Sequence, residues 1–235
     1  DLAVSGNLNL SDASAEGSNI KGRANINLAD LSEILKKNYE KFEKAKPLGV
    51  LHAKFSVLGN IKDIKSCTIS SFITSAAISF YGLKGNQLSM DYNQERGVAD
   101  LTNFQLSCYG GLIEGNARID LNSNSQPFTL VAAVKNLKIE EIKQDTALKK
   151  QDISGVLSAQ AQLSGPLNDI SQTTGTGEIL VNNGKLWQLD LFKGMGKFLF
   201  SSDFSNVVFN EGFCSFIVSD KQIFTENLKL TSNLA

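Results

Sequence analysis

The sequence lacks long apolar runs, although 42% of its 235 residues are hydrophobic. The longest runs, such as residues 128–134, fall well short of the roughly 20 residues with which a helix crosses a bilayer. It also lacks an initiator Met and a signal peptide, because it opens at Asp1 inside the alternating pattern DLAVSGNLNL. We therefore expect both ends to be cuts through a longer protein, with any targeting or anchoring segment outside them.

An excess of charge of one sign is also missing. The 23 basic and 24 acidic residues are mixed along the chain and give a formal net charge of -1. This balance excludes the electrostatic footprint of a nucleic-acid-binding protein. Basic residues are concentrated in one segment, KKNYEKFEKAK at 36–46. That segment fits either a solvated outer helix face or an interfacial helix near lipid headgroups.

Cysteine and histidine are scarce. Cys67, Cys108 and Cys214 are widely spaced and form no C-x-x-C pattern, so we expect small buried residues on strands. A bridge between Cys67 and Cys108 requires that their strands be neighbours. The single histidine, His52, has no second histidine with which to share a metal, and we expect it on a polar strand face.

Enzyme signatures are absent as well. The sequence contains no G-x-S-x-G, H-E-x-x-H, Walker or EF-hand pattern, and its glycine pairs at 175–177 and 194–196 lack the third glycine of a phosphate cradle. Asp63 and Asp169 each follow a glycine-containing turn, where aspartate bonds its own backbone. We therefore predict no catalytic residue, no metal ligand, no cofactor and no enzymatic activity.

Alternation with a period of two dominates what is present. IKGRANINL (20–28) and IEGNARIDL (113–121) place apolar residues on one side and polar residues on the other, as in half-buried strands. The pattern predicts at least ten strands, mostly antiparallel. Similar segments lie at 51–58, 98–108, 128–134, 156–163, 177–182, 213–218 and 226–231, with turn residues at Gly59-Asn60, Gly110-Gly111, Gly165-Pro166 and Asn183-Gly184.

An internal repeat links residues 49–64 to residues 155–170 without a gap, at a shift of 106 positions. The match predicts two copies of one β unit. We assign residues 1–48 to a partial first unit with a connecting helix, 49–154 to repeat unit 1 and 155–235 to a truncated repeat unit 2, together one continuous β domain. Matching pairs include Gly49/Gly155, Val50/Val156, Leu51/Leu157, Ala53/Ala159, Gly59/Gly165, Asp63/Asp169 and Ile64/Ile170, with Leu31/Leu137 and Ile73/Ile179 at the same shift.

A helix is predicted before the Gly-Val-Leu strand of each copy, within residues 30–46 and 136–150. In the first, Asp30 and Glu33 suit an N-terminus and Pro47 stops the helix. A third candidate spans residues 189–200. The overall prediction is an all-β fold with a few short helices, in which repeated units form an extended sheet that curls with its twist. Alternation alone does not distinguish an open apolar groove from a closed sandwich core.

The stretch GTGEILVNNGKLWQLDLFKGMGKFLF (175–200) resembles the C-terminal region of AsmA-like proteins, with a G-x-G strand, an Asn-Gly turn and an apolar-Asp-Leu step into a short helix. Residues 209–232 resemble that family's next hairpin, and LSGPLNDI (163–170) fits its strand and turn. The hairpin turn, Ser219-Asp220-Lys221-Gln222, lacks the glycine that is usual in the family.

This resemblance implies a periplasmic protein of the AsmA/TamB type, anchored in the inner membrane by an N-terminal helix outside this sequence. Such proteins form a taco-like β-groove and are implicated in moving phospholipid toward the outer membrane, in outer-membrane biogenesis. Phospholipid or another lipid is the expected partner, with envelope proteins as further candidates and no nucleic acid. The residues expected to line the groove are Phe55, Val57, Phe104, Leu106, Ile113, Ala117, Ile119, Leu121, Ile179 and Val181.

Two other classes of function stay open at this point. The first is a structural or protein-interaction β module with a closed sandwich core. The second is a carbohydrate-active enzyme, which would need carboxylates about 5 to 10 Å apart in a cleft. No paired acids in the sequence suggest the enzyme.

Overall fold

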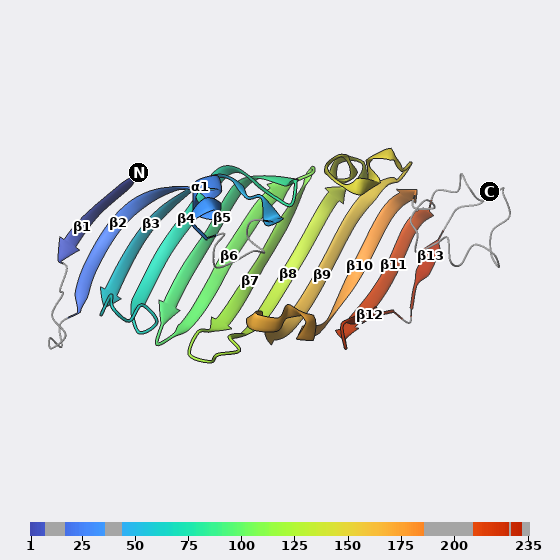
Figure 1. The fold of residues 1–235 in the computed structure, drawn as a ribbon. Helices are drawn as coiled ribbons and strands as arrows, with labels where there is room; N and C mark the ends of the chain where they lie inside the picture. The colour runs from blue at the N-terminus through green and yellow to red at the C-terminus, as the bar shows by residue number, and fades with distance from the viewer. Residues whose placement is uncertain (8–16, 36–43, 186–208, 226, 232–235) are drawn as a thin grey trace.

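A single antiparallel sheet of 13 strands forms the protein in the computed structural model, which describes residues 1–7, 17–35, 44–185, 209–225 and 227–231. Strands β1 to β12 lie side by side in chain order, and β13 pairs with β11. The sheet is curled and is not closed into a barrel (Figure 1). The predicted class, all-β with a few short helices and mostly antiparallel strands, is confirmed.

The described strands are mostly long, and most are joined by short connections. The bounds are β1 Leu2–Asn7, β2 Ser18–Asn27, β3 Leu48–Gly59, β4 Thr68–Phe80, β5 Leu83–Glu95, β6 Val98–Cys108, β7 Gly111–Asp120, β8 Pro127–Lys138, β9 Ser154–Pro166, β10 Thr174–Lys185, β11 Phe209–Ser219, β12 Gln222–Phe224 and β13 Lys229–Thr231. The predicted strand at 226–231 is therefore shortened to β13, and β12 precedes it. Sequence alternation did not predict β4 and β5, in which Ser71 and Ser75 of β4 and Gln94 of β5 take apolar-face positions.

Two-residue turns join four of the hairpins. Tyr81-Gly82, Arg96-Gly97, Tyr109-Gly110 and Asp220-Lys221 each have positive φ at both residues, as in a type I′ turn. The last confirms the predicted turn within 219–222, here formed without glycine. The turn expected at Gly110-Gly111 is shifted by one residue, because Gly111 begins β7.

Bulges interrupt four strands at residues in the left-handed region. Gln87 (φ 53), Asn103 (φ 54), Asn136 (φ 57) and Asn183 (φ 50) lie in β5, β6, β8 and β10, where the register to a neighbouring strand shifts. The prediction of a turn at Asn183-Gly184 is therefore wrong. Each bulge adds one residue, and this insertion brings the next apolar side chain back to the same side of the sheet.

Helices gather at one end of the strands, where β2 and β8 end and β3 and β9 begin (Figure 1). We call this end of the sheet the helical edge. Helix α1 (Leu28–Leu35) continues directly from β2, and Asn27 Oδ1 accepts the Ala29 N–H at 2.9 Å. The predicted start at Asp30 is wrong, because Asn27 already caps the helix at the end of the strand. Residues 36–43 of the basic segment and the third helical candidate, 189–200, lie outside the described residues.

A second helical segment lies between β8 and β9. It consists of α3 (Ile139–Ile142) and two 3₁₀ turns, η1 (Lys143–Asp145) and η2 (Ala147–Lys150). A helix therefore precedes both β3 and β9, as the repeat predicts. A further 3₁₀ turn, η3 (Leu167–Gln172), lies between β9 and β10 at the opposite edge, which we call the loop edge.

A shift of 106 positions in the sequence aligns β3 with β9 and β4 with β10. Ile73 and Ile179 occupy the same face of the sheet, whereas Leu31 lies in α1 and Leu137 in β8. The unit boundaries at 49 and 155 remain a prediction, and both positions lie within strands of one continuous sheet.

Cys67 and Cys108 are free, because the strands beside them are not neighbours. Cys67 precedes β4 and Cys108 ends β6, and β5 lies between these two strands. Both thiols are buried, and burial raises the pKa of each. Cys108 is therefore a buried residue on a strand, as predicted, whereas Cys67 lies just before a strand and its thiol donates to Asn60 O at 3.2 Å.

Replacing Asn136 with valine tests the role of the bulges. The side chain is exposed, so the change removes little packing, but a β-branched residue at φ 57 is strained. We expect Asn136→Val to lower the free energy of unfolding in urea by about 1–2 kcal/mol. Asn136→Gly is the control and should change it by only a few tenths of that amount; equal losses would contradict the account.

The turn without glycine offers a test in the opposite direction. Lys221 is exposed and has φ 64, a conformation that glycine adopts without steric cost. We expect Lys221→Gly to slow amide hydrogen exchange across β12 by roughly two- to fivefold, corresponding to about 0.5–1 kcal/mol. Lys221→Ala keeps the strain and should leave exchange unchanged, so slowing by both variants would count against a turn effect.

Candidate functional site

One side of the sheet, the apolar face, carries most of the alternating apolar side chains, whereas Phe72, Val131 and Ile217 are exposed on the opposite side. A row of directly paired residues on this face crosses eleven strands. Ser71 and the hydroxyl of Tyr92 are the hydrophilic side-chain groups in this row. The row runs through Val4, Gly22, Phe55, Ser71, Tyr92, Leu101, Ala117, Leu130, Leu163, Gly175 and Val218.

The predicted groove residues share this face where they lie in strands. Phe104 and Leu106 reach it because Asn103 adds one residue after Leu101. Leu121 follows β7, and its N–H donates to Gly97 O at 2.7 Å. Of the ten, Val181 is buried and the others are half-buried. The structure thus brings these residues together on one surface, while their role in lining a lipid site stays a prediction.

Few apolar side chains are fully buried, and several of them lie near the helical edge. There Ile139, Ile153 and Val181 form a buried cluster against which Leu148 and Leu157 pack. Toward the middle of the sheet the apolar face is only half-buried. Within the described ranges no second sheet covers this face, so they do not form the closed sandwich core of the alternative prediction.

Three polar side chains on the apolar face, those of Tyr92, Gln94 and Ser75, bond to one another or to the backbone. Tyr92 Oη donates to Gln94 Oε1 at 2.7 Å, and Gln94 Nε2 donates to the carbonyls of Ile64 at 2.6 Å and Cys67 at 3.2 Å. Ser75 Oγ donates to Val50 O at 2.7 Å. These side chains are therefore committed within the sheet and its loops.

The opposite side, the polar face, carries cross-strand pairs of hydrophilic side chains. His52 Nδ1 lies 2.7 Å from Asn25 Oδ1, which confirms a polar-face histidine. Arg118 Nη1 donates to both carboxylate oxygens of Asp100 at 3.2 Å. Gln160 Nε2 donates to Glu178 Oε2 at 2.7 Å. Such pairs stabilise a solvated sheet surface modestly and need no catalytic explanation.

A shallow cavity of about 760 Å³ also lies largely on the polar face, over β1 to β5. Lys21, Arg23 and Lys54 line it together with Phe72 and Asp91. Arg23 and Lys54 are directly opposed cross-strand neighbours, an arrangement of like charges that slightly destabilises a sheet. Across the described residues no group of three or more His, Cys, Asp or Glu side chains is placed to hold a metal ion.

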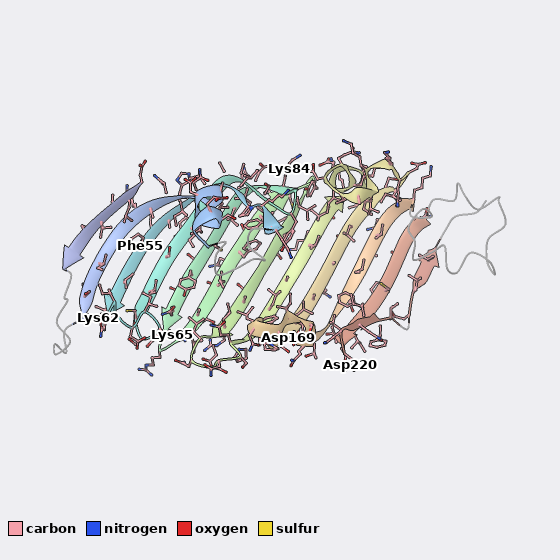
Figure 2. The ribbon with its side chains drawn as sticks, in the orientation of Figure 1. Phe55, Lys62, Lys65, Lys84, Asp169 and Asp220 are labelled. Carbon is pink, nitrogen blue, oxygen red and sulfur yellow. The ribbon has the colours of Figure 1, made fainter. Side chains whose placement is uncertain are left out.

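The recurring aspartates differ in what they bond. Asp169 accepts hydrogen bonds from the Ser171 N–H at 3.1 Å, Ser171 Oγ at 2.6 Å and Gln172 Nε2 at 2.9 Å. These bonds, the Ser171 hydroxyl first, lower the pKa of the Asp169 carboxyl. At Asp63 the backbone carbonyl instead accepts from Ser66 N at 3.0 Å. Both organise turns at the loop edge, as Figure 2 shows for Asp169.

Comparison with known proteins identifies a family. Residues 63–195, more than half of the chain, match the AsmA family. This range overlaps the 175–200 stretch that carried the resemblance and ends before residues 209–232. No curated protein and no solved structure gave a significant match.

The AsmA family is associated with the cell envelope and is not a known enzyme family. No helix within the described residues is long and apolar enough to span a membrane. The extent of the match and the curled antiparallel sheet agree with the resemblance seen in the sequence. The chain belongs to the AsmA family.

Proposed function

We propose that this chain is a segment of a periplasmic protein whose apolar face binds the acyl chains of phospholipids and serves their transport toward the outer membrane. The observation that supports it is the row of directly paired, mostly apolar residues that crosses eleven strands of one sheet layer. In this proposal the full-length protein is anchored in the inner membrane by a segment outside this sequence.

Hydrophobic burial provides the driving force. A contiguous apolar surface of this extent is unfavourable in water unless something covers it. An acyl chain is a suitable cover, because each methylene removed from water contributes about 0.8 kcal/mol. The ladder hydrogen bonds occupy the backbone between strands, so a ligand on this face meets side chains and not unpaired backbone groups.

The chemistry of the face favours a hydrocarbon over a polar ligand. Tyr92, Gln94 and Ser75 bond within the protein, as described above. A protein partner held by directional hydrogen bonds would find few donors or acceptors here. A structural or protein-interaction module that uses this face is the second candidate, and the following experiment separates the two.

Photo-crosslinking from adjacent residues of β8 tests the proposal. Leu130 lies on the apolar face and is half-buried, whereas Val131 lies on the polar face and is 52% exposed. With p-benzoylphenylalanine at each position in turn in envelope-expressed protein, we expect phospholipid adducts from position 130 at least tenfold above those from 131. Mass spectrometry of the adducts gives the readout. Equal adducts, or protein adducts alone from position 130, would overturn the proposal.

A charge placed on the apolar face should weaken lipid binding. Ala161 faces Ala132 and Gly177 there, while Gln162 lies on the polar face of the same strand. We expect Ala161→Glu to reduce the phospholipid retained after incubation with vesicles at least tenfold, because lipid binding would then bury a carboxylate beside hydrocarbon. Gln162→Glu adds the same charge and should retain lipid as the unmodified chain does. Equal retention by both variants would contradict an apolar-face site.

A further inference from the structure

A small apolar pocket lies at the helical edge, beyond the bulges of β5 and β6. Its volume is about 240 Å³. The side chains that line it come from five strands, β4 to β8, and from α3. They include Ile78, Phe80, Leu83, Leu106, Ile113 and Leu137, together with Ile142 of the helix.

The pocket continues the apolar face. Leu106 and Ile113 are a directly paired couple of that face and also line the pocket. Gly85 makes room for the Leu106 side chain, since a Cβ at this position would lie 2.6 Å from Leu106 Cδ1. The left-handed Gln87 and Asn103 shift the register here, which keeps Leu83 and Leu106 on the apolar side.

The helical segment borders the pocket at the sheet edge. Ile142 lines it directly, and the β4–β5 turn approaches η1, where Asp145 O lies 3.7 Å from the position of a Cβ on Gly82. Lys138 N donates to Tyr109 O at 2.9 Å, which ties the end of β8 to the β6–β7 turn. These contacts hold the segment against the strand ends, so the apolar surface ends at this pocket.

The polar atoms at the rim are committed to one another. Lys84 N donates to Tyr109 Oη at 2.6 Å, and Tyr109 Oη donates to Asp145 Oδ2 at 3.1 Å. Lys84 Nζ, at the sheet edge in Figure 2, bonds Asp145 Oδ1 at 2.7 Å. The bond from Lys84 lowers the pKa of the Asp145 carboxyl, and the two side chains form an ion pair at the rim.

We propose that this pocket receives the methyl end of one acyl chain and so sets both the orientation and the preferred chain length of the bound lipid. The inference rests on the proposed lipid-binding function and deepens it. The largely apolar lining excludes a headgroup, because the polar atoms at the rim are bonded to one another. The headgroup then lies farther along the face, toward the loop edge. The pocket volume corresponds to roughly eight water molecules, and a methylene group is of similar size.

Two variants that change the pocket in opposite senses test this. Leu83 is 39% exposed at the rim, and Leu83→Trp fills the pocket, whereas Ile142→Ala enlarges it. Each chain is incubated with vesicles containing equal amounts of phosphatidylethanolamines with 12-, 14-, 16- and 18-carbon acyl chains. The retained lipids are extracted and quantified by mass spectrometry.

We expect Leu83→Trp to shift the retained lipids toward shorter chains, by about fourfold for each methylene displaced from the pocket. Ile142→Ala should shift them toward longer chains, and misfolding does not explain opposite shifts. An unchanged distribution in both variants, with lipid still retained, would overturn the pocket inference and leave the proposed function standing. An unmodified chain that retains none of these lipids would overturn both.

Discussion

The apolar face depends on the period-two alternation of side chains being kept in phase across the whole sheet. A slip of one residue in any strand would move that strand's apolar set to the other side. The sheet maintains the phase with bulges, since Asn103 in β6 and Asn136 in β8 each absorb one residue. The Leu101 and Phe104 side chains consequently share one face although three positions separate them.

Buried side chains are distributed unevenly in this protein. Those at the helical edge contribute to stability, and the half-buried ones in the middle of the apolar face are available for binding. The cluster around Ile153 and Val181 at the helical edge gives the sheet one of its fully buried contacts. The middle of the apolar face has no covering layer among the described residues, so its side chains keep part of their surface available. The hydrogen bonds between strands and the buried cluster at the helical edge stabilise the sheet. The middle of the apolar face is therefore available to bind a ligand.

The sequence predicted the strand type, the antiparallel order and the members of the apolar face, because alternation reports directly which side chains share a side. It missed β4 and β5, where Ser71 and Ser75 of β4 and Gln94 of β5 occupy apolar-face positions and blur the pattern. It also took Asn183-Gly184 for a turn. Asparagine tolerates positive φ in turns and bulges alike, and only the pairing of β10 with both neighbours distinguishes them.

The pocket at the helical edge had no sequence signal, since it combines Gly85 with side chains from five strands and α3 that are far apart in the chain. The central claim, an apolar sheet face that holds phospholipid, is tested most directly by native mass spectrometry of the protein purified from envelopes without added lipid. The account predicts a mass increment that matches phospholipid and that extraction with organic solvent removes. Protein that carries no such increment, and gains none when phospholipid is supplied, would contradict it.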